Sequence, residues 1–157
     1  MSISEEEAAP VCESGFHDTI IRVRYAETDR MGIAYNAHYL TWFEVGRTEF
    51  LRAVGQTYRD TESNGYLLPL SSAEVHYLKP ARYDDVLLIR TYLSERPGAR
   101  LTIGYVILRD DEKIATGSTV HAFTDETLTP VKPPRDLRNE LLKLWSLAQT
   151  HGKESRL

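Results

Sequence analysis

The stretch 23–55 combines residue types that could carry out acyl transfer. It places an acid, Asp29, at the end of a strand-like run, then Gly32 in a turn, and then the start of an amphipathic helix. This order directs a carboxylate and a helix N-terminus at the same small volume. A carboxylate can attack a carbonyl carbon or deprotonate water, and the N–H groups at a helix start can hold an oxyanion. Taken alone, the residues favour a simpler role for Asp29, the capping of a turn.

A strand is expected directly before this acid. Apolar residues alternate with arginines between Ile21 and Tyr25, which is the period of a strand with one buried face, and we assign the strand to 19–27. A loop over 28–35 then leads to the helix. The acid would therefore stand just beyond the end of the strand, close to the start of the helix.

The helix is expected to begin near Ala37, with Asn36 as its N-cap, and to end at Gly55. Apolar residues recur along it with a spacing near 3.6, which predicts one broad buried face. These residues are Tyr39, Trp42, Phe43, Phe50, Leu51 and Val54. Gly46, in the middle, costs about 1 kcal/mol relative to alanine, so another element is expected to approach the helix closely there.

Four more strands and a second helix follow. Short turns separate the strands and predict antiparallel hairpins. The strands are expected over 67–78, 86–95, 101–109 and 113–124. Two prolines precede the final amphipathic helix, whose apolar residues are Leu137, Leu141, Leu144 and Trp145. This order predicts an α+β fold in which a curved antiparallel sheet wraps around one long central helix.

Composition limits the classes of function. The 157 residues fit one domain, with 41% apolar and 27% charged side chains. The net charge of −4 gives no electrostatic basis for binding nucleic acid. Cys12 is the single cysteine, which excludes an internal disulfide and a cysteine-rich metal site. No apolar run reaches the ~20 residues of a membrane span, and 1–16 is typical of a flexible acidic tail rather than a secretory signal. We therefore expect a cytoplasmic protein.

Two motifs together resemble one enzyme family. They are RYAETDRMGIAYNAHYLTWFEVGRTEFLRAVG over 24–55 and VHYLKPARYDD over 75–85. With the order of the elements, they resemble the hotdog-fold acyl-CoA thioesterases, and most closely the 4-hydroxybenzoyl-CoA thioesterase group. This group includes the small bacterial acyl-CoA thioesterases associated with the Tol-Pal envelope system. The resemblance extends over 19–133 and implies a hotdog domain at 17–134, followed by a C-terminal helix and tail at 135–157.

The resemblance implies an acyl-CoA thioesterase with Asp29 as base or nucleophile. It also implies that the backbone N–H of Asn36 stabilises the oxyanion. Many relatives in the envelope-associated branch have histidine where this chain has Asn36, but the backbone role survives that change. The expected substrate-binding residues are Tyr35, Gly32, Tyr39 and Glu44.

Three roles remain open for Glu44. It could be a second acid, it could pair with Arg47 or Thr48 on the helix surface, or it could lie at a subunit contact. The resemblance further implies self-association as a dimer or tetramer, which would cover exposed sheet edges. No cofactor is expected, and His76 and His121 lack a second ligand at a metal-like spacing. Two alternatives stay open: an acyl carrier protein thioester as the substrate, and a non-catalytic acyl-CoA-binding hotdog protein. An enoyl-CoA hydratase on the same fold ranks below both, because the chain has no hydratase motif with an Asp-His pair.

Overall fold

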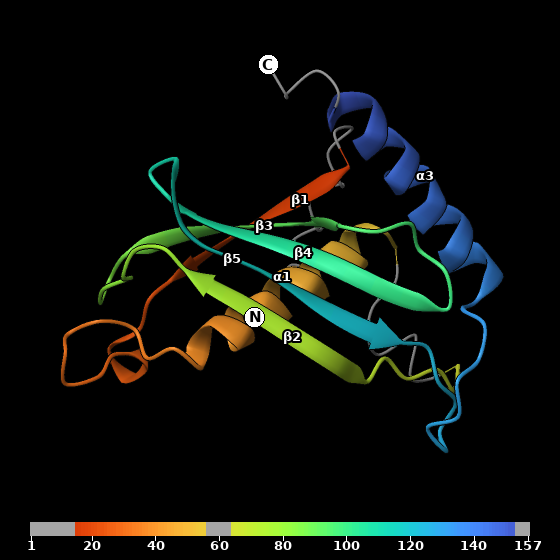
Figure 1. Ribbon diagram of the computed structural model, residues 1–157, viewed down its shortest axis with the longest axis horizontal. Coiled ribbons are helices and arrows are strands. Elements are labelled where there is room, and N and C mark those ends of the chain that lie inside the picture. Colours follow the sequence, from red (N-terminus) through yellow and green to blue (C-terminus); the bar gives the residue numbers. More distant parts are fainter. Residues whose placement is uncertain (1–14, 56–63, 153–157) are drawn as a thin grey trace, which may run out of the picture.

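The computed structural model describes residues 15–55 and 64–152. Cys12 and the expected N-terminal tail up to residue 14 lie outside the described residues. Within the described ranges, five strands form one antiparallel sheet in the order β1-β3-β4-β5-β2, so that β1 and β2 are the edge strands (Figure 1). The strands are β1 (Phe16–Arg22), β2 (Leu70–Tyr77), β3 (Val86–Leu93), β4 (Arg100–Arg109) and β5 (Glu112–Ala122).

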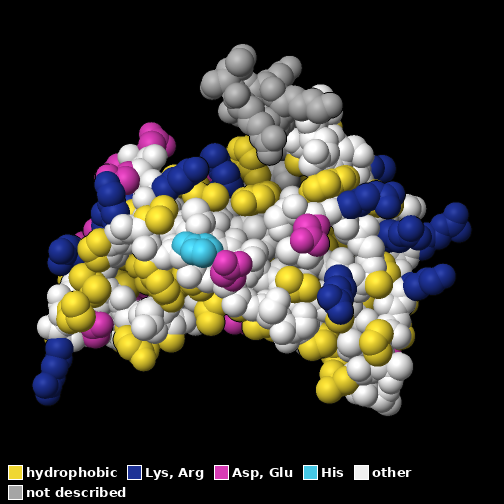
Figure 2. Space-filling view, in the orientation of Figure 1, with side chains coloured by type: hydrophobic (Ala, Val, Ile, Leu, Met, Phe, Trp, Pro, Cys, Tyr) yellow, Lys and Arg dark blue, Asp and Glu magenta, His cyan; other side chains and the backbone are white. Residues whose placement is uncertain are grey.

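Two helices lie against this sheet. The long helix α1 (His38–Ala53) lies behind the sheet in the view of Figure 1, and α3 (Arg135–Gly152) packs at one end of the sheet. Neither of these two described helices is long and apolar enough to cross a membrane. On the face that Figure 2 shows, hydrophobic, acidic and basic side chains are interspersed. The arrangement confirms the predicted α+β hotdog fold, a curved antiparallel sheet around a long central helix.

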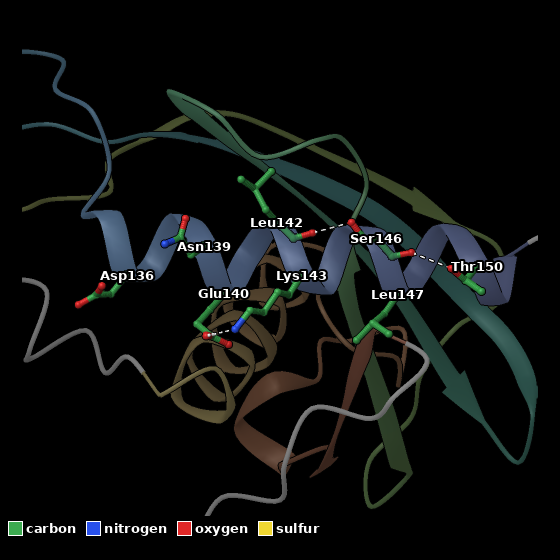
Figure 3. Close-up of a pocket in the computed structure, with 8 residues that line it drawn as sticks. All are labelled: Asp136, Asn139, Glu140, Leu142, Lys143, Ser146, Leu147 and Thr150. Carbon is green, nitrogen blue, oxygen red and sulfur yellow. Dashed lines mark hydrogen bonds and ion pairs between the residues drawn. The ribbon is translucent and has the colours of Figure 1, made fainter.

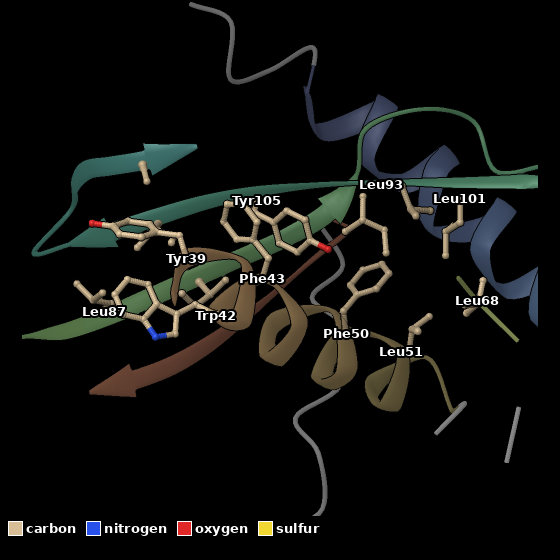
Figure 4. Packing of buried hydrophobic residues seen from close by; sticks show 14 of the residues in the cluster. Tyr39, Trp42, Phe43, Phe50, Leu51, Leu68, Leu87, Leu93, Leu101 and Tyr105 are labelled. Carbon is tan, nitrogen blue, oxygen red and sulfur yellow. The ribbon is translucent and has the colours of Figure 1, made fainter. Parts of the chain in front are cut away.

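The hydrophobic core lies between α1 and the sheet. In Figure 4 the apolar side chains of α1 face those of the strands, and the ring of Phe43 stacks on that of Tyr105 with centroids 4.2 Å apart. A side chain at Gly46 would place its Cβ 2.6 Å from Thr91 Oγ1 and 2.8 Å from Ile89 Cγ2. The predicted close approach at Gly46 is therefore confirmed, and the approaching element is β3.

The strand predicted over 19–27 is wrong at both ends. Phe16 already belongs to β1, and β1 stops at Arg22. The chain then forms a short 3-10 turn, η1 (Tyr25–Glu27), because the carboxylate of Glu27 accepts the backbone N–H of Arg24 at 2.9 Å and closes the turn. Tyr25, which the alternation assigned to the buried face, is 77% exposed, whereas Glu27 is only 4% exposed.

The remaining elements follow the prediction with small shifts at their ends. Leu67 forms only an isolated bridge to Thr124 instead of opening β2. The final helix begins at Arg135 as expected and buries its predicted apolar face. The predicted N-cap is wrong: Ala37 is the N-cap of α1, and no side chain caps the helix. The reason is that the backbone N–H of His38 already bonds to the Tyr35 carbonyl at 3.1 Å.

A row of polar groups leads from half-buried Arg47 of α1 into the core, where its other members are buried. Arg47 Nη1 lies 3.3 Å from the Tyr105 hydroxyl, which lies 2.7 Å from Thr119 Oγ1. The row continues from Thr119 Oγ1 to His121 Nε2 at 2.9 Å. His121 Nδ1 lies 3.3 Å from the Leu68 carbonyl, which can only accept, so Nδ1 carries the proton and Nε2 accepts. Burial and the charge of Arg47 lower the pKa of His121 to about 4, so its ring is neutral at pH 7.

Candidate active site

A small hairpin carries the acid predicted to do chemistry. The backbone N–H of Asp29 bonds to the Ile33 carbonyl at 3.0 Å, and that of Tyr35 bonds to the Glu27 carbonyl at 2.8 Å. These bonds join two short arms, 27–29 and 33–35. Gly32 lies near the tip with φ +75°, a conformation that favours glycine. Asp29 therefore stands on the first arm, and the second arm leads into α1.

The exposed carboxylate of Asp29 has one oxygen engaged and one available. Its Oδ1 accepts the backbone N–H of Met31 at 2.8 Å, which caps the turn. Its Oδ2 makes no hydrogen bond with any residue in the described ranges. The turn-capping role that the residues alone favoured is real, but it uses only one oxygen and leaves the other for chemistry.

Asn36 stands between the second arm and α1. Its carbonyl accepts the hydroxyl of Tyr77 at 2.8 Å, which fixes this residue against the end of β2. Its own backbone N–H makes no hydrogen bond with any part of the chain that the structure describes. Most backbone N–H groups in folded proteins are paired or solvated, so an open one beside a cavity is available to a ligand oxygen.

Asp29 and Asn36 line one cavity of about 550 Å³ between the hairpin and the end of β2. Its lining residues are Asp29, Met31, Ile33, Ala34, Tyr35, Asn36, Tyr39, Tyr77, Leu78, Lys79 and Pro80. The structure thus brings together four residues that the sequence predicted for the site: Asp29, Asn36, Tyr35 and Tyr39. Gly32 does not line the cavity; it shapes the turn that presents Asp29.

Glu44 lies elsewhere on α1. It lines a separate hollow of about 350 Å³ with Thr41, Val45, Thr48 and Glu49. Its carboxylate makes no hydrogen bond or ion pair with a residue in the described ranges, and Arg47 turns inward to the Tyr105 hydroxyl instead. The predicted pairing of Glu44 with Arg47 or Thr48 is therefore wrong. The subunit contact stays a prediction.

The other polar groups of the cavity are held by their neighbours. Burial raises the pKa values of Tyr39 and Tyr77, so both phenols stay protonated and can donate. The ammonium of Lys79 lies 3.1 Å from Glu112, which offsets its charge. Among the described residues, no cluster of three or more histidine, cysteine, aspartate or glutamate side chains could hold a metal ion.

Sequence reasoning missed the contribution of Tyr77, Leu78, Lys79 and Pro80. In the sequence these residues are recognisable only as part of the motif over 75–85 that follows the helix. Their place at the cavity depends on β2 ending beside the start of α1, which no local pattern reveals. The motif spacing itself was the available signal, because it places an aromatic residue and a Lys-Pro pair directly at a predicted strand end.

A larger hollow of about 900 Å³ lies along α3 and offers no comparable chemistry. Figure 3 shows that some of its polar side chains bond within the helix itself: Ser146 and Thr150 donate to carbonyls one turn earlier, and Glu140 pairs with Lys143 at 3.1 Å. Asp136 and Asn139 line the same hollow and make no such bond in this view. Its lining residues all belong to α3 and, apart from Leu142, are exposed. The hollow therefore lies on the outer surface of a single helix, and the hairpin cavity, which forms between separate elements, is the better candidate.

Comparison with known proteins points in one direction. Residues 23–141 match the family model of the thioesterase-like superfamily. A Bacillus subtilis protein named "Putative acyl-CoA thioesterase YneP" is 37% identical over 114 residues, covering 71% of this chain and 83% of that protein. A DHNA-CoA thioesterase structure from Staphylococcus aureus is 30% identical with a TM-score of 0.78, covering 90% of this chain and 96% of that one. A 4-hydroxybenzoyl-CoA thioesterase structure covers 80% of this chain and 98% of its own, at 18% identity and a TM-score of 0.73; this likeness concerns the fold alone.

Proposed function

This chain belongs to the thioesterase-like superfamily and is a thioester hydrolase, and we propose that it cleaves an acyl-CoA into the free acid and coenzyme A. One observation carries the proposal. The free carboxylate oxygen of Asp29 and the open backbone N–H of Asn36 belong to residues that line the same cavity. The aromatic and apolar side chains around them, among them Tyr35 and Leu78, suit an acyl group.

The two groups divide the chemistry between them. Asp29 attacks the thioester carbonyl carbon to form a mixed anhydride, or it removes a proton from a water that attacks the same carbon. In either case the carbonyl oxygen becomes an oxyanion, and the N–H of Asn36 donates to it. Collapse of the intermediate breaks the carbon–sulfur bond, and the thiolate of coenzyme A leaves and takes up a proton. On the anhydride route, a water then releases the acid and restores Asp29.

Thiol release from a panel of acyl-CoAs tests this assignment. The panel comprises the benzoyl, hydroxybenzoyl, acetyl, hexanoyl and palmitoyl thioesters of coenzyme A. Wild type is compared with Asp29→Asn. We expect wild type to turn over at least one class, and the variant to lose on the order of a hundredfold or more in kcat, because the amide neither attacks nor accepts a proton.

Asp125 provides a matched control. Its Oδ1 accepts the backbone N–H of Thr127 at 2.8 Å, the same turn-capping contact that Asp29 makes with Met31, but in the loop after β5. Asp125→Asn should therefore leave kcat unchanged. A folded Asp29→Asn protein with full activity would show that Asp29 only caps a turn. A wild type that cleaves none of the esters would refute acyl-CoA hydrolysis, and an acyl carrier protein thioester would be tested next.

We also propose that two copies join through β2. This strand lies at the sheet edge, and seven of its eight residues are exposed, with only Val75 half-buried. Pairing two β2 strands about a two-fold axis is antiparallel, so the Leu70 end of one copy lies beside the Tyr77 end of the other. The partner would then border the cavity. Sedimentation equilibrium should give twice the chain mass of 17.9 kDa, and a monomer at micromolar concentration would refute this assembly.

A further inference from the structure

We propose that Glu27 is a positioning residue that holds Asp29 and the Asn36 N–H in register by tying their hairpin to Trp42 of α1. The proposal rests on the function proposed above and adds a residue that does not itself line the cavity. The carboxylate of Glu27 is buried and has no role in the proposed hydrolysis chemistry.

Both carboxylate oxygens of Glu27 are engaged. Oε2 accepts the indole Nε1–H of Trp42 at 2.8 Å, and Oε1 accepts the backbone N–H of Arg24 at 2.9 Å. Both side chains of the Glu27–Trp42 pair are buried, so water does not compete for the bond. Trp42 is itself fixed, because its ring packs against Tyr39 with centroids 4.6 Å apart. Glu27 is therefore anchored to a rigid part of the helix.

The charge state of Glu27 supports positioning rather than proton transfer. Burial raises its pKa, but the bonds from Arg24 and Trp42 and the charge of Arg24 lower it more, and the net pKa lies below the ordinary value. Glu27 therefore remains ionised at neutral pH. With both oxygens occupied by donors, it has no free position from which to reach a thioester.

Glu27 is joined to both catalytic groups through the backbone. Its carbonyl accepts the N–H of Tyr35 at 2.8 Å, and Tyr35 directly precedes Asn36. In the other direction, Asp29 follows Glu27 by two residues on the same arm. A shift of Glu27 therefore moves the carboxylate and the oxyanion donor together relative to α1. Misplacement by about 1 Å can cost a hundredfold in rate.

Two other contacts should keep the hairpin folded when Glu27 is changed. The N–H of Ala34 bonds to the Ala81 carbonyl at 2.8 Å, and the hydroxyl of Tyr77 bonds to the Asn36 carbonyl. The substitution Glu27→Gln keeps the shape of the side chain. Its oxygen can satisfy only one of the two donors, so its NH₂ faces the N–H of Arg24 or the indole N–H of Trp42. The tie weakens while the fold remains.

The test measures kcat, KM and the pH profile of Glu27→Gln. We expect kcat to fall about 10- to 100-fold, with KM unchanged within about threefold. The acid limb of the pH–rate profile should stay at the wild-type pH, because the substitution leaves the proposed base, Asp29, in place. A lost acid limb would instead make Glu27 the base, and unchanged kcat would overturn the proposal.

Asp18→Asn is the matched control for a general loss of stability. This substitution also removes a charged contact, because both carboxylate oxygens of Asp18 bond to Arg90 at 2.9 Å. Asp18 lies on β1 and does not line the cavity. The variant is therefore a test of lost stability alone. It should be destabilised without a change in kcat. If Glu27→Gln and Asp18→Asn lower the unfolding midpoint equally and lower kcat equally, the effect of Glu27 is only structural and the proposal fails.

A second variant and a spectroscopic readout separate this inference from the proposed function. Trp42→Phe keeps an aromatic ring but removes the N–H donor, so it should also lower kcat. The double variant Glu27→Gln/Trp42→Phe should lower kcat no more than the more damaging of the two single substitutions. The chain has two tryptophans, and Glu27→Gln should shift one indole N–H resonance and leave that of Trp145. Suppose that this resonance shifts, that wild type is active and that Asp29→Asn is inactive. If Glu27→Gln nevertheless retains full kcat, only the inference about Glu27 fails. If wild type cleaves no acyl-CoA, the proposed function itself fails.

Discussion

Replacing His121 with glutamine should remove a pH-dependent part of the stability of this fold. The ring of His121 is 1% exposed and lies at the end of the polar row under α1. Its pKa is lowered from 6.5 to about 4. Glutamine can still donate to the Leu68 carbonyl and accept from Thr119, but it does not titrate.

The sign and size follow from linkage. Because the folded pKa lies below the unfolded one, the unfolded state takes up a proton first as pH falls. The contribution of His121 is therefore fully present above pH 6.5 and is lost between pH 6.5 and about 4. A tenfold difference in proton affinity between the two states corresponds to about 1.4 kcal/mol, so the loss amounts to about 3 kcal/mol of unfolding free energy.

Urea unfolding at pH 7, 6, 5 and 4 measures this loss, at one fixed protein concentration because self-association would shift the transition. Wild type should lose about 3 kcal/mol more than His121→Gln over this range. The comparison cancels other acid-sensitive groups, Glu27 among them, since both proteins contain them. If the two proteins show parallel pH dependence, His121 is not held neutral by its surroundings and the assignment of its proton to Nδ1 loses its basis.

Two further substitutions test features of the site and of the core. Asn36→Ala should keep kcat within about threefold of wild type, because the proposed mechanism uses only the backbone N–H of this residue, which alanine also supplies. A tenfold loss in steady-state thiol release would instead assign a role to the side-chain amide of Asn36. Gly46→Ala should lower the unfolding free energy by about 1–2 kcal/mol despite the better helix propensity of alanine, because the new Cβ would lie 2.6 Å from Thr91 Oγ1. Thr41→Ala, an exposed position of the same helix, is its control and should not destabilise, whereas a gain in the urea midpoint for Gly46→Ala would contradict the close approach of β3.

Local patterns were sufficient for much of this structure. The spacing of Tyr39, Phe43 and Phe50 predicts α1 and its buried face, and strand alternation predicts β3, β4 and β5 to within a few residues. Asp29 and Asn36 are only seven residues apart, so a turn and a helix start were enough to bring them together. These features depend on the local sequence alone and not on contacts between distant parts of the chain.

Contacts that depend on the tertiary arrangement were not accessible in the same way. The alternation places Tyr25 in the interior, but the structure buries the carboxylate of Glu27 instead. Glu27 is buried because the indole N–H of Trp42, fifteen residues later in the chain, donates a hydrogen bond to it. Tyr77 reaches Asn36 only because β2 ends beside α1. Glu44 shares the helix with the site, yet the period of the helix cannot tell which hollow an exposed side chain borders.

The oxyanion donor proposed here belongs to the main chain, and that makes it nearly invisible to mutational scanning. Every residue type except proline supplies the same N–H at position 36, so a library of substitutions would report this position as tolerant. The sensitive positions would be those that hold the peptide in place, Glu27 and Tyr77, although neither would touch the reacting carbon. A tolerance map of this protein would thus outline the support of the site more clearly than the atom that does the chemistry.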